Sequence, residues 1–125
     1  MEFINDIQSP APCGAYSHAV RSGNFLFISG QVPFDPATGN VVGSDISEQT
    51  TQTMKNLVSI LNSSGLTLDN IVKTTVYLAN WDDFSGFNTV YADYLGAHKP
   101  ARASVEVRRI AKDALLEIEA IAEFS

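Results

Sequence analysis

Two segments near the C-terminus alternate between polar and apolar residues, and this alternation constrains the fold more than any other feature of the sequence. The segments are residues 100–107 and 115–122. Successive side chains on a strand point to opposite faces, so each segment is expected to be a strand with two different faces. If both strands place their small apolar residues on one side of a sheet, Arg102 and Glu117 face the same space. Because arginine can bind a carboxylate through two hydrogen bonds and glutamate can transfer a proton, this shared space is our first hypothesis for a site.

The rest of the chain predicts further strands and two helices. We expect a β-hairpin over residues 17–29, a helix that begins at Asp45 and ends at Gly65, and a strand over residues 71–79. A second helix is expected to start at Asp82 or Asp83 and to end at Gly96. Pro-rich and Gly-rich residues 5–15 and 33–44 are expected to be loops. The order of elements predicts an α+β fold, and the length of 125 residues predicts a single domain, 1–125.

Two helices can cover only one face of such a sheet. Phe25 and Phe27 share a strand face with Ser29, and Ile121 shares one with Glu117 and Glu119. A face that mixes aromatic and polar residues in this way is typical neither of a core nor of a solvent-exposed surface. We therefore expect copies of the chain to associate, with polar pockets at the boundaries between subunits.

Composition disfavours several classes of function. The single cysteine, Cys13, excludes an internal disulfide and a cysteine-based metal site, and His18 and His98 have no partners at ligand spacing. A net charge of −6 argues against nucleic acid as the main partner, because such binding depends on clustered basic residues. The N-terminus lacks the pattern of a signal peptide and no segment is apolar enough to span a membrane, so we expect a cytoplasmic protein.

Several different short motifs occur along the chain, and their order and spacing are highly specific when they are taken together. They are Gly14-Ala15-Tyr16, Ile28 to Pro33, Thr38-Gly39, Asp69 to Val76, Asp83-Phe84 with Asn88, Pro100-Ala101-Arg102, Val105-Glu106-Val107 and Glu117 to Ala122. In these motifs the chain resembles the RidA family of reactive imine deaminases over almost its full length.

The resemblance implies a chorismate-mutase-like α+β fold, in which a mixed sheet carries two helices on one face. It also implies a homotrimer whose uncovered sheet faces turn inward and leave clefts between subunits. The implied activity is hydrolysis of 2-imino acids and 2-aminoacrylate-type enamines to 2-oxo acids and ammonia. The resemblance implies that these small molecules are the partners and that no metal or organic cofactor takes part.

Two residues carry the catalytic roles that the resemblance implies. Arg102 is expected to bind the substrate carboxylate with its planar guanidinium, a geometry that lysine does not reproduce. Without the resemblance, an ion pair of Arg102 with Glu106 or Glu119 is the simpler expectation. Glu117 is expected to orient and deprotonate the attacking water and to return a proton to the leaving nitrogen, with a pKa raised by burial. A solvated glutamate on a strand is the alternative.

The resemblance also implies a set of substrate-binding residues, which are Tyr16, Ser29, Gly30, Asn88, Arg102 and Ser104. Tyr16 is expected to close the pocket. Many family members have cysteine where this chain has Ser104, whose backbone groups could hold substrate equally well. Lys99 stands where an aromatic residue is common and Ala15 where proline is usual, and these departures affect the substrate range more than the type of reaction.

Two other functions compete with imine hydrolysis at this point. One is a trimer that binds a small ligand or a protein without turnover, since a fold does not determine a function. The other is a ribonuclease or translation inhibitor, an activity also attributed to family members. The acidic balance of the chain disfavours the second.

Overall fold

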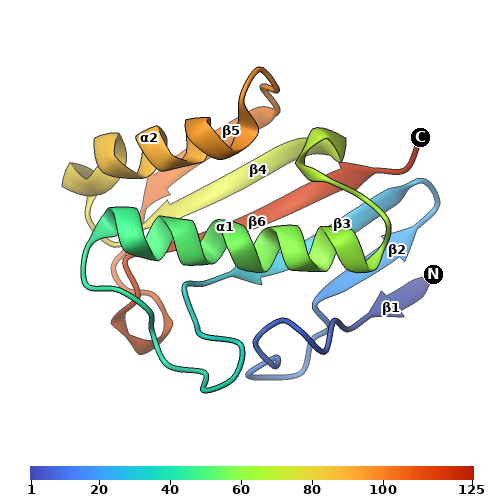
Figure 1. Ribbon diagram of the computed structural model, residues 1–125, viewed down its shortest axis with the longest axis horizontal. Coiled ribbons are helices and arrows are strands. Elements are labelled where there is room, and N and C mark those ends of the chain that lie inside the picture. Colours follow the sequence, from blue (N-terminus) through green and yellow to red (C-terminus); the bar gives the residue numbers. More distant parts are fainter.

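The computed structural model describes all residues, 1–125, and contains one six-stranded sheet with two helices packed on it (Figure 1). The strands and α-helices are β1 (Glu2–Ile4), β2 (Ala19–Ser22), β3 (Phe25–Gln31), α1 (Ile46–Ser63), β4 (Ile71–Leu78), α2 (Phe84–Leu95), β5 (Ala101–Glu106) and β6 (Leu116–Glu123). Three short 3-10 helices are η1 (Leu68–Asn70), η2 (Trp81–Asp83) and η3 (Ala111–Asp113). The strand order is β1-β2-β3-β6-β4-β5. Only β4 and β5 are parallel, so the sheet is mixed.

The predicted start of the first helix is confirmed, and the predicted cap of the second is wrong. The Asp45 side chain accepts a hydrogen bond of 2.8 Å from the backbone N–H of Glu48, which satisfies one of the free donors in the first turn of α1. Asp83 precedes α2 but makes no capping hydrogen bond. Asn80 accepts instead from the N–H of Asp82, because the 3-10 turn η2 comes before α2 and starts the helical path earlier.

The hairpin of β2 and β3 is confirmed, and the N-terminal strand is an addition that we did not predict. Gly23 takes a φ of 60° between the two strands, a left-handed conformation that favours glycine. β1 pairs with β2 and extends the sheet at its edge. Three residues are too few for an alternating pattern to indicate a strand.

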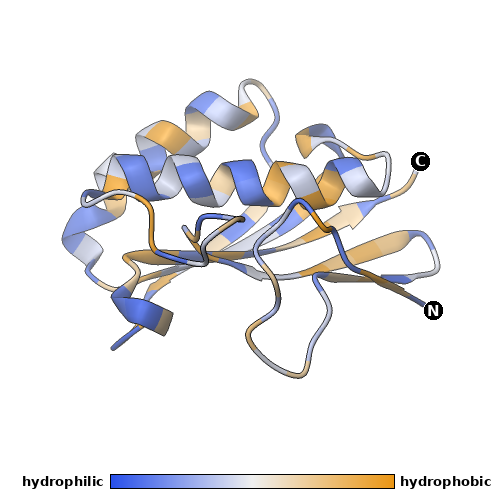
Figure 2. Cartoon of the chain, turned by 60° about the horizontal axis from the view of Figure 1, so that its bottom comes forward, coloured by the Kyte–Doolittle hydropathy of each residue, from blue (hydrophilic) through white to orange (hydrophobic).

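The core lies between the two helices and one face of the sheet, and both helices lie on the same side (Figure 2). α1 contributes Met54 and Leu57, α2 contributes Phe87, and the sheet contributes Leu26 and Ile118, all with 3% exposure or less. The even-numbered residues of β6 from 116 to 122 all face this core. The α+β class with two helices on one face of a mixed sheet is therefore confirmed.

The other face of the sheet has no helix over it, and we call it the open face. Cross-strand pairing aligns four apolar side chains in one row on it, namely Phe3, Val20, Phe27 and Ile121. Phe3 is 67% exposed and Phe27 is 45% exposed. The mixed aromatic and polar face that the sequence predicted is thus present.

None of the helices combines the length and the hydropathy of a membrane span.

Candidate functional site

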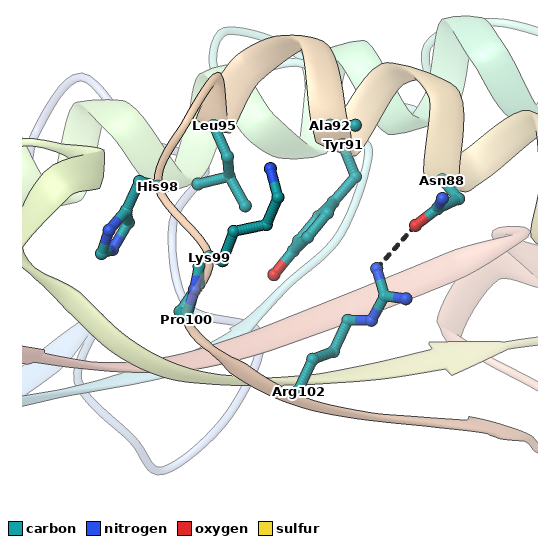
Figure 3. A pocket seen from close by; sticks show the side chains of 8 residues that line it. All are labelled: Asn88, Tyr91, Ala92, Leu95, His98, Lys99, Pro100 and Arg102. Atoms are coloured by element: carbon teal, nitrogen blue, oxygen red, sulfur yellow. Dashed lines mark hydrogen bonds between the residues drawn. The ribbon is translucent and has the colours of Figure 1, made fainter.

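Arg102 projects from β5 toward α2, on the helix side of the sheet (Figure 3). Its Nη1 donates a hydrogen bond of 2.7 Å to Oδ1 of Asn88. The guanidinium carbon lies 5.1 Å from the ring centroid of Tyr91 and 5.4 Å from that of Phe84. Aromatic faces attract a cation electrostatically, so these rings and Asn88 together orient the guanidinium.

A cavity of about 350 Å³ opens beside this guanidinium. Its lining residues are Asn88, Tyr91, Ala92, Leu95, His98, Lys99, Pro100 and Arg102. The ion pair that we considered with Glu106 or Glu119 is absent: the Glu106 carboxylate accepts instead from the backbone N–H of Trp81, and Glu119 lies on the open face. Arg102 keeps N–H donors free for a carboxylate, which is the group a guanidinium binds best.

Ser104 lies next to Arg102 on the helix side of the same strand. Its hydroxyl oxygen is buried and has no hydrogen-bond partner within the chain. Buried hydroxyl groups normally have a partner. The Ser104 hydroxyl is therefore a hydrogen-bonding group without a partner on the same face of β5 as Arg102.

Glu117 points to the opposite side of the sheet, so our hypothesis of a shared face is wrong within one chain. β4 lies between the two C-terminal strands, and its Thr74 pairs with Arg102 on one side and with Ala120 on the other. Arg102 and Ala120 consequently face the helices. Glu117 lies an odd number of residues from Ala120, so it faces the open side. Our hypothesis assumed that the small apolar residues of β5 and β6 share a face of the sheet. In the structure they lie on opposite faces.

A β-bulge shapes the surroundings of Glu117. Ile28 pairs with Ala120 and Gln31 with Ile118, so Ser29 and Gly30 together face Glu119 alone. The bulge brings the backbone of Gly30 close to the Glu117 side chain. A Cβ atom built on Gly30 would lie 2.5 Å from Oε2 of Glu117, which means that only glycine leaves room for the carboxyl group in this position.

The Glu117 carboxyl group is half-buried and accepts no hydrogen bond. Burial raises its pKa above the ordinary value of 4.5, and the neighbouring Glu119 raises this pKa further. Burial and a like charge both disfavour the ionised form. A carboxyl group with a raised pKa can exchange protons nearer to neutral pH, as general acid–base catalysis requires.

Ser29 belongs to this bulge, and Tyr16 precedes the residue that Ser29 contacts. The Ser29 hydroxyl donates a hydrogen bond of 2.7 Å to the carbonyl of Ser17, the residue after Tyr16. Tyr16 is 49% exposed, and its hydroxyl oxygen accepts a hydrogen bond of 3.1 Å from the backbone N–H of Cys13. This bond ties the tyrosine to its own loop and leaves much of the ring uncovered.

The residues predicted for the site therefore fall into two groups. The helix-side group consists of Asn88, Arg102 and Ser104, and the open-face group consists of Gly30 and Glu117. Ser29 lies in the bulge beside Gly30, and Tyr16 is bonded within its own loop. The two groups lie on opposite sides of the sheet. No three His, Cys, Asp or Glu side chains lie in an arrangement suited to a metal ion.

Sequence reasoning missed the aromatic rings around Arg102 and the contact of Tyr77 with Glu119. The helical spacing of Phe84 and Tyr91 predicts a buried apolar stripe, which gives no indication that their rings face Arg102. Tyr77 lies on β4 directly opposite Glu117, and its hydroxyl donates to Oε1 of Glu119. The sequence predicts only a strand here, and the partner of Tyr77 depends on the register of β4 with β6.

Comparisons with known proteins agree with this architecture. The family model described as Endoribonuclease L-PSP matches residues 6–124. A RutC family protein of Pyrococcus horikoshii is 51% identical over 121 residues, covering 97% of this chain and 96% of the relative. The 2-iminobutanoate/2-iminopropanoate deaminase of Rattus norvegicus is 41% identical, covering 97% of this chain and 88% of the relative.

A solved structure supports the same assignment. The crystal structure of E. coli TdcF with bound serine superposes with a TM-score of 0.94 at 35% identity, covering 100% of both chains. The family match, the two relatives and this structure all extend over nearly the whole chain. The chain belongs to the RidA family, whose family model is described as Endoribonuclease L-PSP.

Proposed function

We propose that this chain hydrolyses 2-imino acids and their 2-aminoacrylate-type enamine tautomers to 2-oxo acids and ammonia. One observation carries the proposal: Glu117 is a half-buried carboxyl group with a raised pKa in a chain that is 41% identical to a rat imine deaminase. Such a group can accept a proton from water and return it to nitrogen at a pH where an ordinary glutamate stays ionised.

The chemistry requires a cation for the substrate carboxylate and a base for the water. Arg102 binds the carboxylate through the N–H groups that Asn88 does not use. Glu117 takes a proton from water as the water oxygen bonds to the imine carbon and passes this proton to the nitrogen, which gives a neutral tetrahedral carbinolamine. Glu117 then takes the proton of the carbinolamine hydroxyl and passes it to the nitrogen, so that the C–N bond breaks, ammonia leaves and the carbonyl of the 2-oxo acid forms. An enamine first gains a proton at carbon and loses one from nitrogen, which converts it to the imine.

The two groups of residues meet only if different copies of the chain supply them. The helix-side group and the open-face group lie on opposite sides of one sheet. We therefore propose a homotrimer in which Arg102 of one copy and Glu117 of the next line the same cleft. The exposed apolar row on the open face supports association, because burial of apolar surface stabilises such contacts. The serine bound to the related TdcF carries a carboxylate, as the proposed substrates do.

A direct test supplies freshly generated 2-iminobutanoate and follows its trapping as a semicarbazone. Hydrolysis competes with trapping, so wild type should lower the rate of semicarbazone formation. Arg102→Ala and Glu117→Gln should each leave it at the rate seen in buffer. Arg21→Ala is a matched control, because this arginine packs on Phe124, bonds to the carbonyl of Gly23, and lines neither the cavity at Arg102 nor the one at Glu117. Wild-type protein that does not change the trapping rate would rule out the proposed activity.

Mixed assemblies test whether the site lies between copies. When inactive Arg102→Ala and Glu117→Gln chains are co-expressed, a site that takes one residue from each of two copies is intact in about one quarter of random combinations. Activity should then recover to roughly that fraction of wild type. A site contained in one chain gives no recovery, because every chain in the mixture lacks one of the two groups.

The same preparations decide between the competing functions. A binding protein without turnover would leave 2-imino acid trapping unchanged while a 2-oxo acid still bound at Arg102. RNA cleavage should be measured as well, because the matching family model is described as an endoribonuclease. Cleavage that copurifies with the assembly and disappears in Arg102→Ala would favour a ribonuclease, although the net charge of −6 works against binding of a phosphate backbone.

A further inference from the structure

A tyrosine hydroxyl and a second carboxylate lie beside Glu117 on the open face. Tyr77 on β4 pairs directly with Glu117 on β6. Its hydroxyl does not bond to Glu117 and instead donates to Oε1 of Glu119, which lies diagonally opposite. Diagonal positions on adjacent strands are within reach of a long aromatic side chain. The Glu119 carboxylate is therefore held in a defined place, whereas Glu117 makes no hydrogen bond.

Few charged or titratable groups lie near Glu117. β4 contributes the phenol of Tyr77 and, further along the same face, the ammonium group of Lys73, which lines a small cavity with Glu119. The loop before β6 contributes Arg109, which lines a cavity of about 210 Å³ with Glu117 but is paired with Asp113. β3 contributes only uncharged residues at the bulge. Glu119 is thus the acidic group next to Glu117 on this face.

We propose that Tyr77 and Glu119 form a positioning pair, in which the tyrosine hydroxyl fixes a carboxylate beside Glu117 and so makes Glu117 the group that exchanges protons. This inference rests on the proposed function, because it assigns Glu117 the acid–base role in imine hydrolysis. Neither Tyr77 nor Glu119 needs to touch the substrate. Their effect is to place a negative charge where it disfavours the ionised form of their neighbour.

The electrostatics of both groups agree with this arrangement. Glu119 is the second cause, after burial, of the raised pKa of Glu117. The hydrogen bond to Glu119 is the main cause of the raised pKa of Tyr77, so the phenol keeps its proton and remains a donor at neutral pH. A carboxyl group whose pKa is raised by its surroundings is suited to the acid–base role at such a site.

The first test is the pH profile of kcat/KM for imine hydrolysis. In wild type the rate should rise as Glu117 loses its proton. Glu119→Gln removes the neighbouring charge and should move this rise to lower pH. It should also lower the maximal rate, by less than the roughly 100-fold or greater loss expected for Glu117→Gln. Tyr77→Phe frees the Glu119 carboxylate and should produce a smaller shift in the same direction.

A second measurement does not depend on activity. Carbon-13 NMR of glutamate carboxyl groups in the intact assembly reports the titration midpoint of Glu117 itself. The midpoint should fall in Glu119→Gln and, by less, in Tyr77→Phe. Glu123→Gln is the matched control, because Glu123 is exposed and lies on the same strand and face but is not a cause of the Glu117 pKa shift. Thermal unfolding and elution volume confirm that the variants remain folded and assembled.

The outcomes separate the two proposals. An unchanged Glu117 midpoint in Glu119→Gln overturns the positioning pair, even if the variant loses activity. A lowered midpoint with no change in the pH profile of hydrolysis also overturns it, because Glu117 would then not be the group that limits the rate. Full hydrolysis by Glu117→Gln would instead overturn the catalytic role on which this inference rests.

Discussion

Replacement of Gly30 by alanine should abolish most of the activity while leaving the fold almost as stable as before. A Cβ atom at this position would lie 2.5 Å from Oε2, 2.7 Å from Cδ and 3.0 Å from Cγ of Glu117. Carbon atoms in favourable contact are about 3.5–4.0 Å apart, so the carboxyl group must move by roughly 1 Å or more. A displacement of about 1 Å can reduce catalysis about 100-fold, and we expect a loss of that size in kcat/KM.

The stability of the variant should change little, for two opposing reasons. The group that must move is the end of a flexible side chain, and an off-rotamer glutamate costs about 0.5–1.5 kcal/mol. The backbone of Gly30 is outside the left-handed region, so alanine can adopt it without strain. Alanine also restricts the unfolded chain, which favours folding by about 0.4–1 kcal/mol. The net change in the free energy of unfolding should therefore stay within about 1 kcal/mol.

The assay combines imine hydrolysis with denaturant unfolding of the same preparation. Gly14→Ala is the matched control, because its added Cβ would lie 3.7 Å from the Tyr16 ring, an ordinary contact. Gly14→Ala should keep both activity and stability. The reasoning is refuted if Gly30→Ala hydrolyses imines at the wild-type rate, or if its activity is lost only because the protein unfolds.

Three further predictions concern assembly, substrate binding and pH. Phe27→Asp places a charge in the exposed apolar row and should shift the chain to a smaller species by light scattering, with loss of activity. Asn88→Ala removes the 2.7 Å bond that orients Arg102 and should raise KM about tenfold with little change in kcat. Glu117→Gln should be more stable than wild type at pH 8, because a folded-state pKa above 4.5 makes the ionised form unfavourable in the fold. In denaturant titrations this difference should shrink as the pH falls through the raised pKa and vanish below about pH 4; a difference that persists in acid would contradict it.

The sequence predicted the elements well because local signals and burial agree along most of the chain. The Asp45 cap begins α1, the hairpin turns at Gly23, and the core-facing residues of β6 alternate as expected. The prediction of an element failed where the local signal in the sequence was weak or where a neighbouring residue was the better cap. β1 is too short to show a pattern, and the predicted caps, Asp82 and Asp83, lie within the 3-10 turn that Asn80 caps before α2.

The site was harder to predict, because it depends on which strands are neighbours. Alternation showed that Arg102 and Ser104 share a face, and that Glu117 and Glu119 share a face. It could not show how the two faces relate, since β4 separates the two strands and its register decides the outcome. A slip of one residue would reverse every side chain of a strand, and no signal within either strand specifies that register. A glycine at position 30 predicts a bend or a close approach of the backbone, but it does not show that Glu117 is the group that approaches.

The separation of Arg102 and Glu117 also connects assembly with the acidity of Glu117. Burial is the largest cause of its raised pKa, and the carboxyl group is only half-buried in a single chain. If another copy covers the open face, the exposed rings of Phe3 and Phe27 lose their contact with water, and the same contact removes water from Glu117. Association would then raise the pKa of Glu117 further while bringing it to Arg102. The carboxylate would become a stronger base only where a substrate can bind, so isolated copies would lack both the cleft and the further raised pKa on which the proposed reaction depends.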